Sequence, residues 1–149
     1  MLVSLIVASI TAMAPFSTEQ DRANSVQAGD MKGYEQSLYQ GKWYDPSDEW
    51  NRKCIMKRES HYNYRAANPT SSARGAYQFL DNNWRDGLVW MMLAESKETK
   101  DGLRKDIKAL RDKPIHRWNR YYQDRAFWTA WRFGEGKNHW YWPGSSCLG

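Results

Sequence analysis

The segment 45–59 constrains the fold most, because its pattern is typical of one helix that ends in a carboxylate. Asp45 is a common N-cap residue, and Pro46 suits the first helical position. Apolar residues then recur at helical spacing, and basic residues fill the last turns, as the helix dipole prefers. The apolar stripe consists of Trp50, Cys54 and Ile55. The sequence therefore predicts a helix that begins at Asp45 and presents Glu59 at its C-terminal end.

Glu59 has two interpretations from these residues alone. Ile55 and Met56 precede it at spacings that share one helix face. A carboxyl held beside apolar groups and near carbonyl ends favours its neutral form, which a general acid needs to cleave a glycosidic bond. The alternative is a solvated glutamate that pairs with a nearby lysine or arginine. The helix by itself leaves both interpretations open.

Short motifs follow Glu59 along the chain. They are Glu59-Ser60, Asn68-Pro69, Gly75, Tyr77-Gln78-Phe79 and Trp84, with Gly136, His139-Trp140 and Cys147 near the end. Together with Cys54, they resemble the catalytic segment of the resuscitation-promoting factors and related transglycosylase-like domains of the lysozyme superfamily. The resemblance covers residues 46–84 well and residues 118–147 loosely. It departs from the family pattern in the longer, more charged segment 85–114 and in the gap between Cys54 and Glu59.

The resemblance implies a mainly α fold, a small lysozyme-like helical domain with a substrate cleft above the end of the first helix. It implies a lytic transglycosylase of the muramidase type, which cuts the bond between N-acetylmuramic acid and N-acetylglucosamine with one catalytic glutamate, here Glu59. Peptidoglycan glycan strands are the expected partner, and no cofactor is needed. The alternative is a catalytically silent cell-wall-binding or virion structural module of the same fold.

Four residues are expected to bind the substrate: Asn68, Tyr77, Gln78 and Trp84. Aromatic residues make up 15% of the chain, more than a core of this size needs, and flat aromatic faces stack on sugar rings. The alternatives are packing for the two aromatic rings, turn formation for Asn68 and a satisfied core amide for Gln78. Asp81 and Asp86 are the candidates for a second carboxylate, but neither lies in a motif that resembles a nucleophile.

The two cysteines lie far apart in the sequence, Cys54 in the first predicted helix and Cys147 near the end. The family resemblance implies a disulfide between them, which suits an oxidising compartment. Two unpaired buried thiols are the alternative. The histidines are His61, His116 and His139. They show no ligand spacing with the cysteines, so the sequence predicts no metal site.

The chain is basic, with 22 basic against 17 acidic residues and a net charge of +5. A basic protein is attracted to polyanions, which include cell-wall polymers and nucleic acid. The charge is dispersed, and no recognised nucleic-acid-binding motif is present. We therefore expect no nucleic acid partner.

The first 18 residues carry no charge, and their apolar run ends near Ala12 and Ala14, as in a secretory signal. No basic residue precedes this run, Pro15 follows at once, and it is short for a membrane span. Both secretion to the cell wall and packaging in a phage virion remain open, with this segment contacting a membrane or other virion proteins. The expected units are the apolar segment 1–18, a linker or arm at 19–44 and the catalytic domain at 45–149.

Helices are also expected beyond Trp84. Asp81 or Asn82 is expected to cap one helix, a second is predicted over 99–112, and the longest over 115–132 with Gly134 closing it. No alternating strand pattern of useful length is present.

Overall fold

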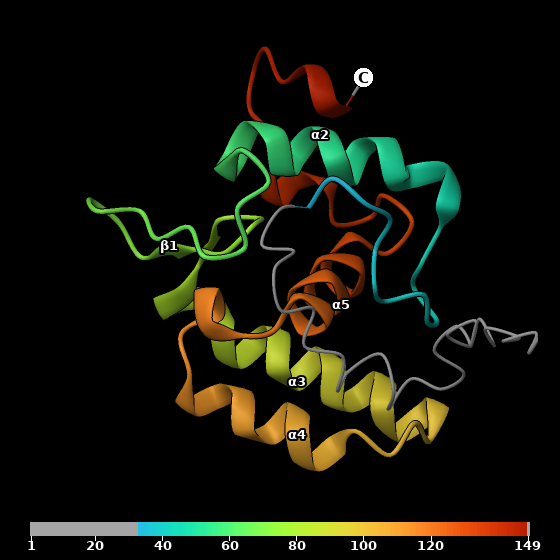
Figure 1. The fold of residues 1–149 in the computed structure, drawn as a ribbon. Coiled ribbons are helices and arrows are strands. Elements are labelled where there is room, and N and C mark those ends of the chain that lie inside the picture. Colours follow the sequence, from blue (N-terminus) through green and yellow to red (C-terminus); the bar gives the residue numbers. More distant parts are fainter. Residues whose placement is uncertain (1–32, 149) are drawn as a thin grey trace, which may run out of the picture.

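Helix α5 (Arg120–Trp131) runs through the centre of the fold, and every one of its residues is buried (Figure 1). Helix α2 (Glu49–Ser60) lies on one side of it, and α3 (Asp81–Thr99) and α4 (Arg104–Ala109) lie on the other. This computed structural model describes residues 33–148, which are mainly helical, as the sequence predicts. The predicted apolar segment 1–18 lies outside the described residues.

The predicted start of the first helix is confirmed. Asp45 is the N-cap, and its carboxylate accepts a hydrogen bond of 2.8 Å from the backbone N–H of Ser47. A 3-10 turn, η1 (Pro46–Asp48), then leads into α2. Helix α2 ends where His61 adopts a left-handed conformation with φ of 53°. Glu59 is therefore in the last turn of α2, as predicted.

A small antiparallel hairpin follows α2. It pairs β1 (Ala73–Arg74) with β2 (Phe79–Leu80), and Figure 1 shows it beside the C-terminal end of α2. Each strand has only two residues, so sequence alternation could not reveal it.

The helix boundaries after the hairpin differ from the prediction. Helix α3 begins at Asp81, but the carboxylate does not cap it: it accepts a hydrogen bond from the backbone N–H of Ile115 instead. The helix predicted over 99–112 is confirmed only from Arg104 onward, because α3 continues to Thr99 and Gly102 then breaks the chain with φ of 79°. Two short pieces follow, α4 and the 3-10 turn η2 (Leu110–Asp112).

The prediction that 115–132 is one helix and the longest is wrong. Residues Ile115–Arg117 form a 3-10 turn, η3, and Trp118 is extended. Asn119 then caps α5 by accepting a hydrogen bond of 3.1 Å from the N–H of Tyr122. Among the described residues the longest helix is α3, with 19 residues. At this break the indole of Trp118 donates hydrogen bonds to the carbonyls of Leu110, in η2, and Lys113, just after it.

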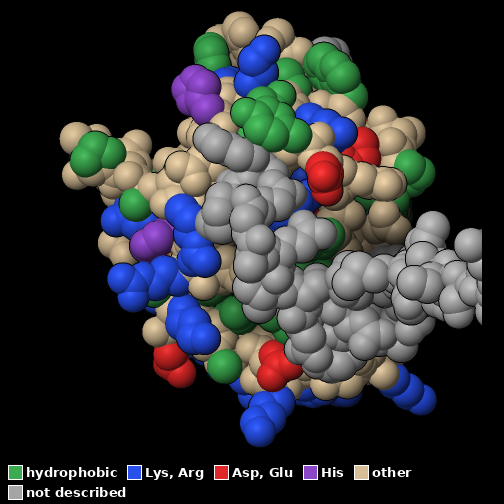
Figure 2. All heavy atoms as spheres, in the orientation of Figure 1, with side chains coloured by type: hydrophobic (Ala, Val, Ile, Leu, Met, Phe, Trp, Pro, Cys, Tyr) green, Lys and Arg blue, Asp and Glu red, His purple; other side chains and the backbone are tan. Residues whose placement is uncertain are grey.

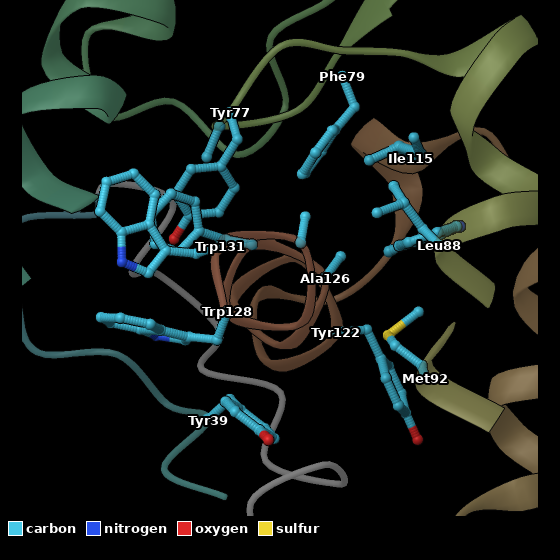
Figure 3. Packing of buried hydrophobic residues seen from close by; sticks show 14 of the residues in the cluster. Tyr39, Tyr77, Phe79, Leu88, Met92, Ile115, Tyr122, Ala126, Trp128 and Trp131 are labelled. Carbon is cyan, nitrogen blue, oxygen red and sulfur yellow. The ribbon is translucent and has the colours of Figure 1, made fainter. Parts of the chain in front are cut away.

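The core is rich in aromatic side chains, which surround α5 (Figure 3). Tyr77 stacks on Phe127 with ring centroids 4.6 Å apart, and Phe127 stacks on Trp131 at 5.6 Å. Tyr39, within the segment expected to be a linker or arm, is fully buried in the same core. Packing therefore uses many of the aromatic residues, including part of the segment 33–44.

Asp124, in α5, is a fully buried carboxylate with several donors. Oδ1 accepts hydrogen bonds from the hydroxyls of Tyr64 and Tyr77, the latter at 2.6 Å. Oδ2 accepts from the backbone N–H of Leu38 at 2.9 Å, and Arg52 of α2 lies 3.6 Å from Oδ1. Because a buried charge must be paired and hydrogen-bonded, this network fixes α2 and α5 relative to each other.

The next residue, Arg125, organises a second buried network toward α3. Its guanidinium lies 3.1 Å from Glu95 and 2.8 Å from Asp101. The hydroxyl of Tyr39 donates to the other oxygen of Glu95. Burial raises the pKa of Glu95, while Arg125 opposes that change. Neighbouring residues of α5 thus hold helices on its two sides.

Candidate active site

Glu59 lies one residue before the end of α2, with 26% of its side chain exposed. Its Oε1 accepts two hydrogen bonds from Arg58, at 2.9 Å from Nε and 2.7 Å from Nη2. Ile55 and Met56, on the preceding turn, are fully buried. Within residues 33–148, no hydrogen bond or ion pair engages Oε2. One oxygen is therefore held by arginine, and the other has no partner among the described residues.

Arg58 also joins Glu59 to the C-terminal segment. Nη2 donates to the carbonyl of Trp140 at 2.8 Å, and Nη1 donates to the hydroxyl of Ser145 at 2.5 Å. The guanidinium lies 5.4 Å from the ring of Trp142. Four hydrogen bonds, two of them to Glu59, and the contact with Trp142 therefore fix the orientation of the Arg58 side chain.

The predicted disulfide between Cys54 and Cys147 is confirmed, with the two Cα atoms 5.5 Å apart. The side chain of Asn51 reinforces it by donating a hydrogen bond of 2.8 Å to the carbonyl of Cys147. Figure 1 shows the C-terminal segment, in red, along the outer side of α2. The bridge therefore ties the end of the chain to the helix that carries Glu59.

Ser60 connects the end of α2 to the turn of the hairpin. Its hydroxyl donates a hydrogen bond of 2.7 Å to the carbonyl of Ala76. The N–H of Ala76 in turn donates to Oε1 of Gln123, a buried amide on α5, at 3.0 Å. Gly75 has φ of 79°, and a Cβ atom there would collide with the same oxygen of Gln123. The turn therefore requires glycine at position 75.

Tyr77, expected to bind substrate, lies in the core with only 1% of its surface exposed. Its hydroxyl accepts a hydrogen bond of 3.0 Å from Arg52 and donates to Asp124. Its backbone carbonyl accepts a hydrogen bond of 3.1 Å from the indole of Trp140. The side chain thus has the packing role that the sequence offered as its alternative, and its backbone holds Trp140.

Asn68 and Gln78 both take part in turns. Oδ1 of Asn68 accepts hydrogen bonds from the N–H and hydroxyl of Thr70, at 2.9 and 3.0 Å. Gln78 has φ of 50°, and its amide donates to the carbonyl of Gly75 at 3.0 Å. Both amides therefore take part in turns. For Asn68, this is the alternative that the sequence offered.

Trp84 is partly exposed and meets His139 edge-on, with ring centroids 4.1 Å apart. The two rings line a pocket of about 260 Å³, together with side chains that include Arg132 and Glu135. Burial lowers the pKa of His139, which favours its neutral form at pH 7. Glu59 is not among the residues that line this pocket. Trp84 lines this pocket, whereas Asn68, Tyr77 and Gln78 do not.

The candidates for a second carboxylate have different environments. Asp81 is buried, bonds to the N–H of Ile115 at 2.8 Å and lies 3.3 Å from Arg85. Asp86 is exposed on α3. The structure therefore gives Asp81 a supporting role between α3 and η3. Across residues 33–148, no group of three or more histidine, cysteine or acidic residues is placed to hold a metal ion.

The sequence did not indicate a role for two exposed aromatic rings near the C-terminal end of α2. Tyr141 and Trp142 are 59% and 50% exposed, in the segment between Trp140 and the disulfide. The available signal was their position: they follow the His-Trp motif in a stretch with no helical periodicity that would bury them.

Comparison with known protein families, curated proteins and solved structures found no match to this chain. None of the helices described for residues 33–148 is long and apolar enough to span a membrane. What the protein does must therefore be inferred from the contacts among its own residues.

Proposed function

We propose that the protein is a peptidoglycan lytic transglycosylase with Glu59 as its catalytic acid. The observation that carries this proposal is that motifs far apart in the sequence contact one another around the end of α2. The Ser60 hydroxyl donates a hydrogen bond to the hairpin turn, and the Trp140 indole donates one to the hairpin carbonyl of Tyr77. Arg58 donates hydrogen bonds to Glu59 and to the carbonyl of Trp140. The proposal includes a lysozyme-like arrangement, with the glycan strand crossing above the end of α2.

The proposed reaction needs one carboxyl group. Oε2 of Glu59 donates a proton to the oxygen between N-acetylmuramic acid and N-acetylglucosamine, and that bond breaks. The substrate's own N-acetyl group stabilises the resulting cation. The Glu59 carboxylate then accepts the proton of the sugar 6-hydroxyl, which closes a 1,6-anhydro ring and restores the acid. Arg58, on Oε1, stabilises the carboxylate between these two steps.

A mechanism with two carboxylates fits these residues less well. It requires a partner roughly 5–5.5 Å away for retention or 6.5–9.5 Å away for inversion. Asp81, the nearest candidate in the sequence, already holds Ile115 and Arg85. This supports the single-acid reaction, for which no cofactor is required.

The substrate contacts belong to the same proposal. Trp84 stacks on a sugar ring from the pocket that it shares with His139, because an aromatic face offers apolar contact to the sugar. Asn68 and Gln78 keep turn conformations from which an amide reaches sugar hydroxyl groups. Tyr77 acts through packing, by supporting Trp140.

The decisive experiment measures the loss of turbidity of purified peptidoglycan sacculi. Wild type should clear them, and Glu59→Gln should lose activity by roughly 10²–10⁴-fold, the contribution of a general acid. Glu98→Gln is the matched control, because Glu98 has a side chain 64% exposed and pairs with Lys42 on another part of the surface. Equal clearing by Glu59→Gln would move catalysis to another carboxylate.

The released fragments test the type of reaction. Muropeptides that end in 1,6-anhydro sugars would support the transglycosylase step. Reducing ends without anhydro sugar would mean hydrolysis by a lysozyme-like route, with Glu59 still as the acid.

A catalytically silent wall-binding or virion structural module is the second candidate. The ion pair between Glu59 and Arg58 favours it, because this pair, together with the Arg58 bond to Trp140, can hold the end of α2 to the C-terminal segment without any turnover. Such a module would bind sacculi and release no soluble fragments. In both cases we propose a location outside the cytoplasm, either secreted to the wall or carried in a phage virion.

A further inference from the structure

A second pocket, of about 320 Å³, lies between the α4 region and the start of α5. Its lining includes Asp106, Lys113, Arg117, Trp118 and Tyr122. In Figure 1, α4 and α2 lie on opposite sides of α5, and Glu59 does not line this pocket. We call it the α4–α5 pocket. The proposed cleavage reaction does not use it.

Tyr122 places an unsatisfied polar group in the wall of the α4–α5 pocket. Its side chain is 5% exposed, and its hydroxyl has no hydrogen-bond partner in the part of the chain that the structure describes. Burial and the neighbouring charge of Asp106 raise the pKa of Tyr122, so the hydroxyl keeps its proton at neutral pH. A buried hydroxyl without a partner is unfavourable, and a ligand oxygen satisfies it once a small movement of the pocket wall uncovers it.

Two cations at the pocket favour an anionic ligand. The side chains of Lys113 and Arg117 form no hydrogen bond or ion pair with any residue from 33 to 148. A phosphate group suits such a pair, because a guanidinium and an ammonium both donate to its oxygens. Asp106 would repel a second anion but accepts hydrogen bonds from ligand hydroxyl groups.

The positive charge continues beyond the pocket. Burial lowers the pKa of His116, and the charges of Arg74, Arg117 and Arg65 lower it further, while Asp81 opposes them. Arg65 also donates a hydrogen bond of 3.3 Å to the His116 carbonyl. Figure 2 shows lysine and arginine side chains on the side of the molecule where residues 110–117 lie in Figure 1. An extended polyanion could therefore follow this face.

We propose that the α4–α5 pocket binds a polyol phosphate. The phosphate lies between Lys113 and Arg117, and the polyol hydroxyl groups bond to Asp106 and Tyr122. The indole of Trp118, which is buried, forms part of the pocket wall and is fixed by hydrogen bonds of 3.1 and 2.9 Å to the carbonyls of Leu110 and Lys113. Free polyol phosphates and polymers of polyol phosphate offer the same chemistry.

The test is isothermal titration calorimetry of the full chain with glycerol 3-phosphate. Tyr122→Phe should bind about tenfold more weakly, since it loses one hydrogen bond to the ligand. Its unfolding midpoint should not fall, because the hydroxyl has no partner to lose in the described part of the chain. Arg117→Gln should also bind at least tenfold more weakly. Arg111→Gln, an exposed arginine outside the pocket lining, should bind like wild type.

Several results would overturn the proposal. The first is the absence of any heat of binding at millimolar glycerol 3-phosphate. The second is equal affinity of Arg117→Gln and wild type for this ligand. The third is glycerol binding as tightly as glycerol 3-phosphate. If the proposal is correct, poly(glycerol phosphate) distinguishes the sources of the ligand. Tighter binding of the polymer per phosphate would assign the site to a polymer, and equal binding would assign it to a free polyol phosphate.

Discussion

Glu59 and Asp124 are both carboxylates that contact arginine, yet their surroundings differ. Asp124 is fully buried and accepts hydrogen bonds from two tyrosine hydroxyls and a backbone N–H, with Arg52 nearby. Glu59 is 26% exposed, and among residues 33–148 only Arg58 bonds to its carboxylate, at Oε1. A carboxylate whose acceptor positions are all occupied can support the fold but cannot exchange protons with a ligand. A carboxylate with one free oxygen at a helix end can do so.

The two sites also share one physical connection. Tyr77 bonds to Asp124 through its hydroxyl and holds Trp140 through its carbonyl, and Trp140 accepts a bond from Arg58. The buried network therefore supports the exposed site through one tyrosine. The comparison predicts that changes at Asp124 reduce stability, and that changes at Glu59 reduce activity with little effect on stability.

The largest effect on stability is expected for Asp124→Ala. It leaves Arg52 and two tyrosine hydroxyls without their buried acceptor, which should lower the free energy of unfolding by roughly 3–5 kcal/mol. Urea denaturation followed by tryptophan fluorescence measures this. A loss under about 1 kcal/mol would show that the buried network does not hold the helices together.

Removal of the disulfide should have the next largest effect. Cys54→Ser combined with Cys147→Ser opens a loop with a sequence separation of 93 and should destabilise the fold by roughly 2–4 kcal/mol. Reductant added to wild type should lower the unfolding midpoint by the same amount, and it should leave the double variant unchanged. Equal midpoints for the double variant and oxidised wild type would contradict this prediction.

A pair of glycines tests the turn beside Ser60. Gly75→Ala introduces both an unfavourable left-handed backbone and a collision with Gln123, so we expect a loss of about 1–3 kcal/mol. Gly87→Ala is the control, because position 87 lies within α3 with open space around it. There alanine should stabilise by up to about 1 kcal/mol. Thermal unfolding should move the two midpoints in opposite directions.

The smallest effect on stability is expected for Glu59→Gln. A partly exposed ion pair contributes about 0–1 kcal/mol, so the unfolding free energy should stay within that range of wild type. The unfolding free energy of Glu59→Gln should be measured by urea denaturation together with the turbidity assay. A loss comparable with that of Asp124→Ala would mean that Glu59 is a structural residue, and the comparison would fail.

Predictions from the sequence succeeded where the signal was local. The start of the first helix depends on Asp45 and Pro46, whose effect reaches only the adjacent turn. They failed where tertiary contacts set the boundaries, as at Trp118 and Asn119. Of the candidate site residues, the disulfide pair was confirmed, while the catalytic and substrate-binding roles remain predictions.

The sequence by itself determined a mainly helical fold and a glutamate at the end of the first long helix, because caps and periodicity act over a few residues. Only the tertiary structure decided which charges are buried and what Arg58 contacts. The partners of Arg58 lie 82 and 87 residues away, and the donors to Asp124 lie 47 to 86 residues away. Burial and pairing depend on which distant segments pack together, and local sequence patterns carry no such information.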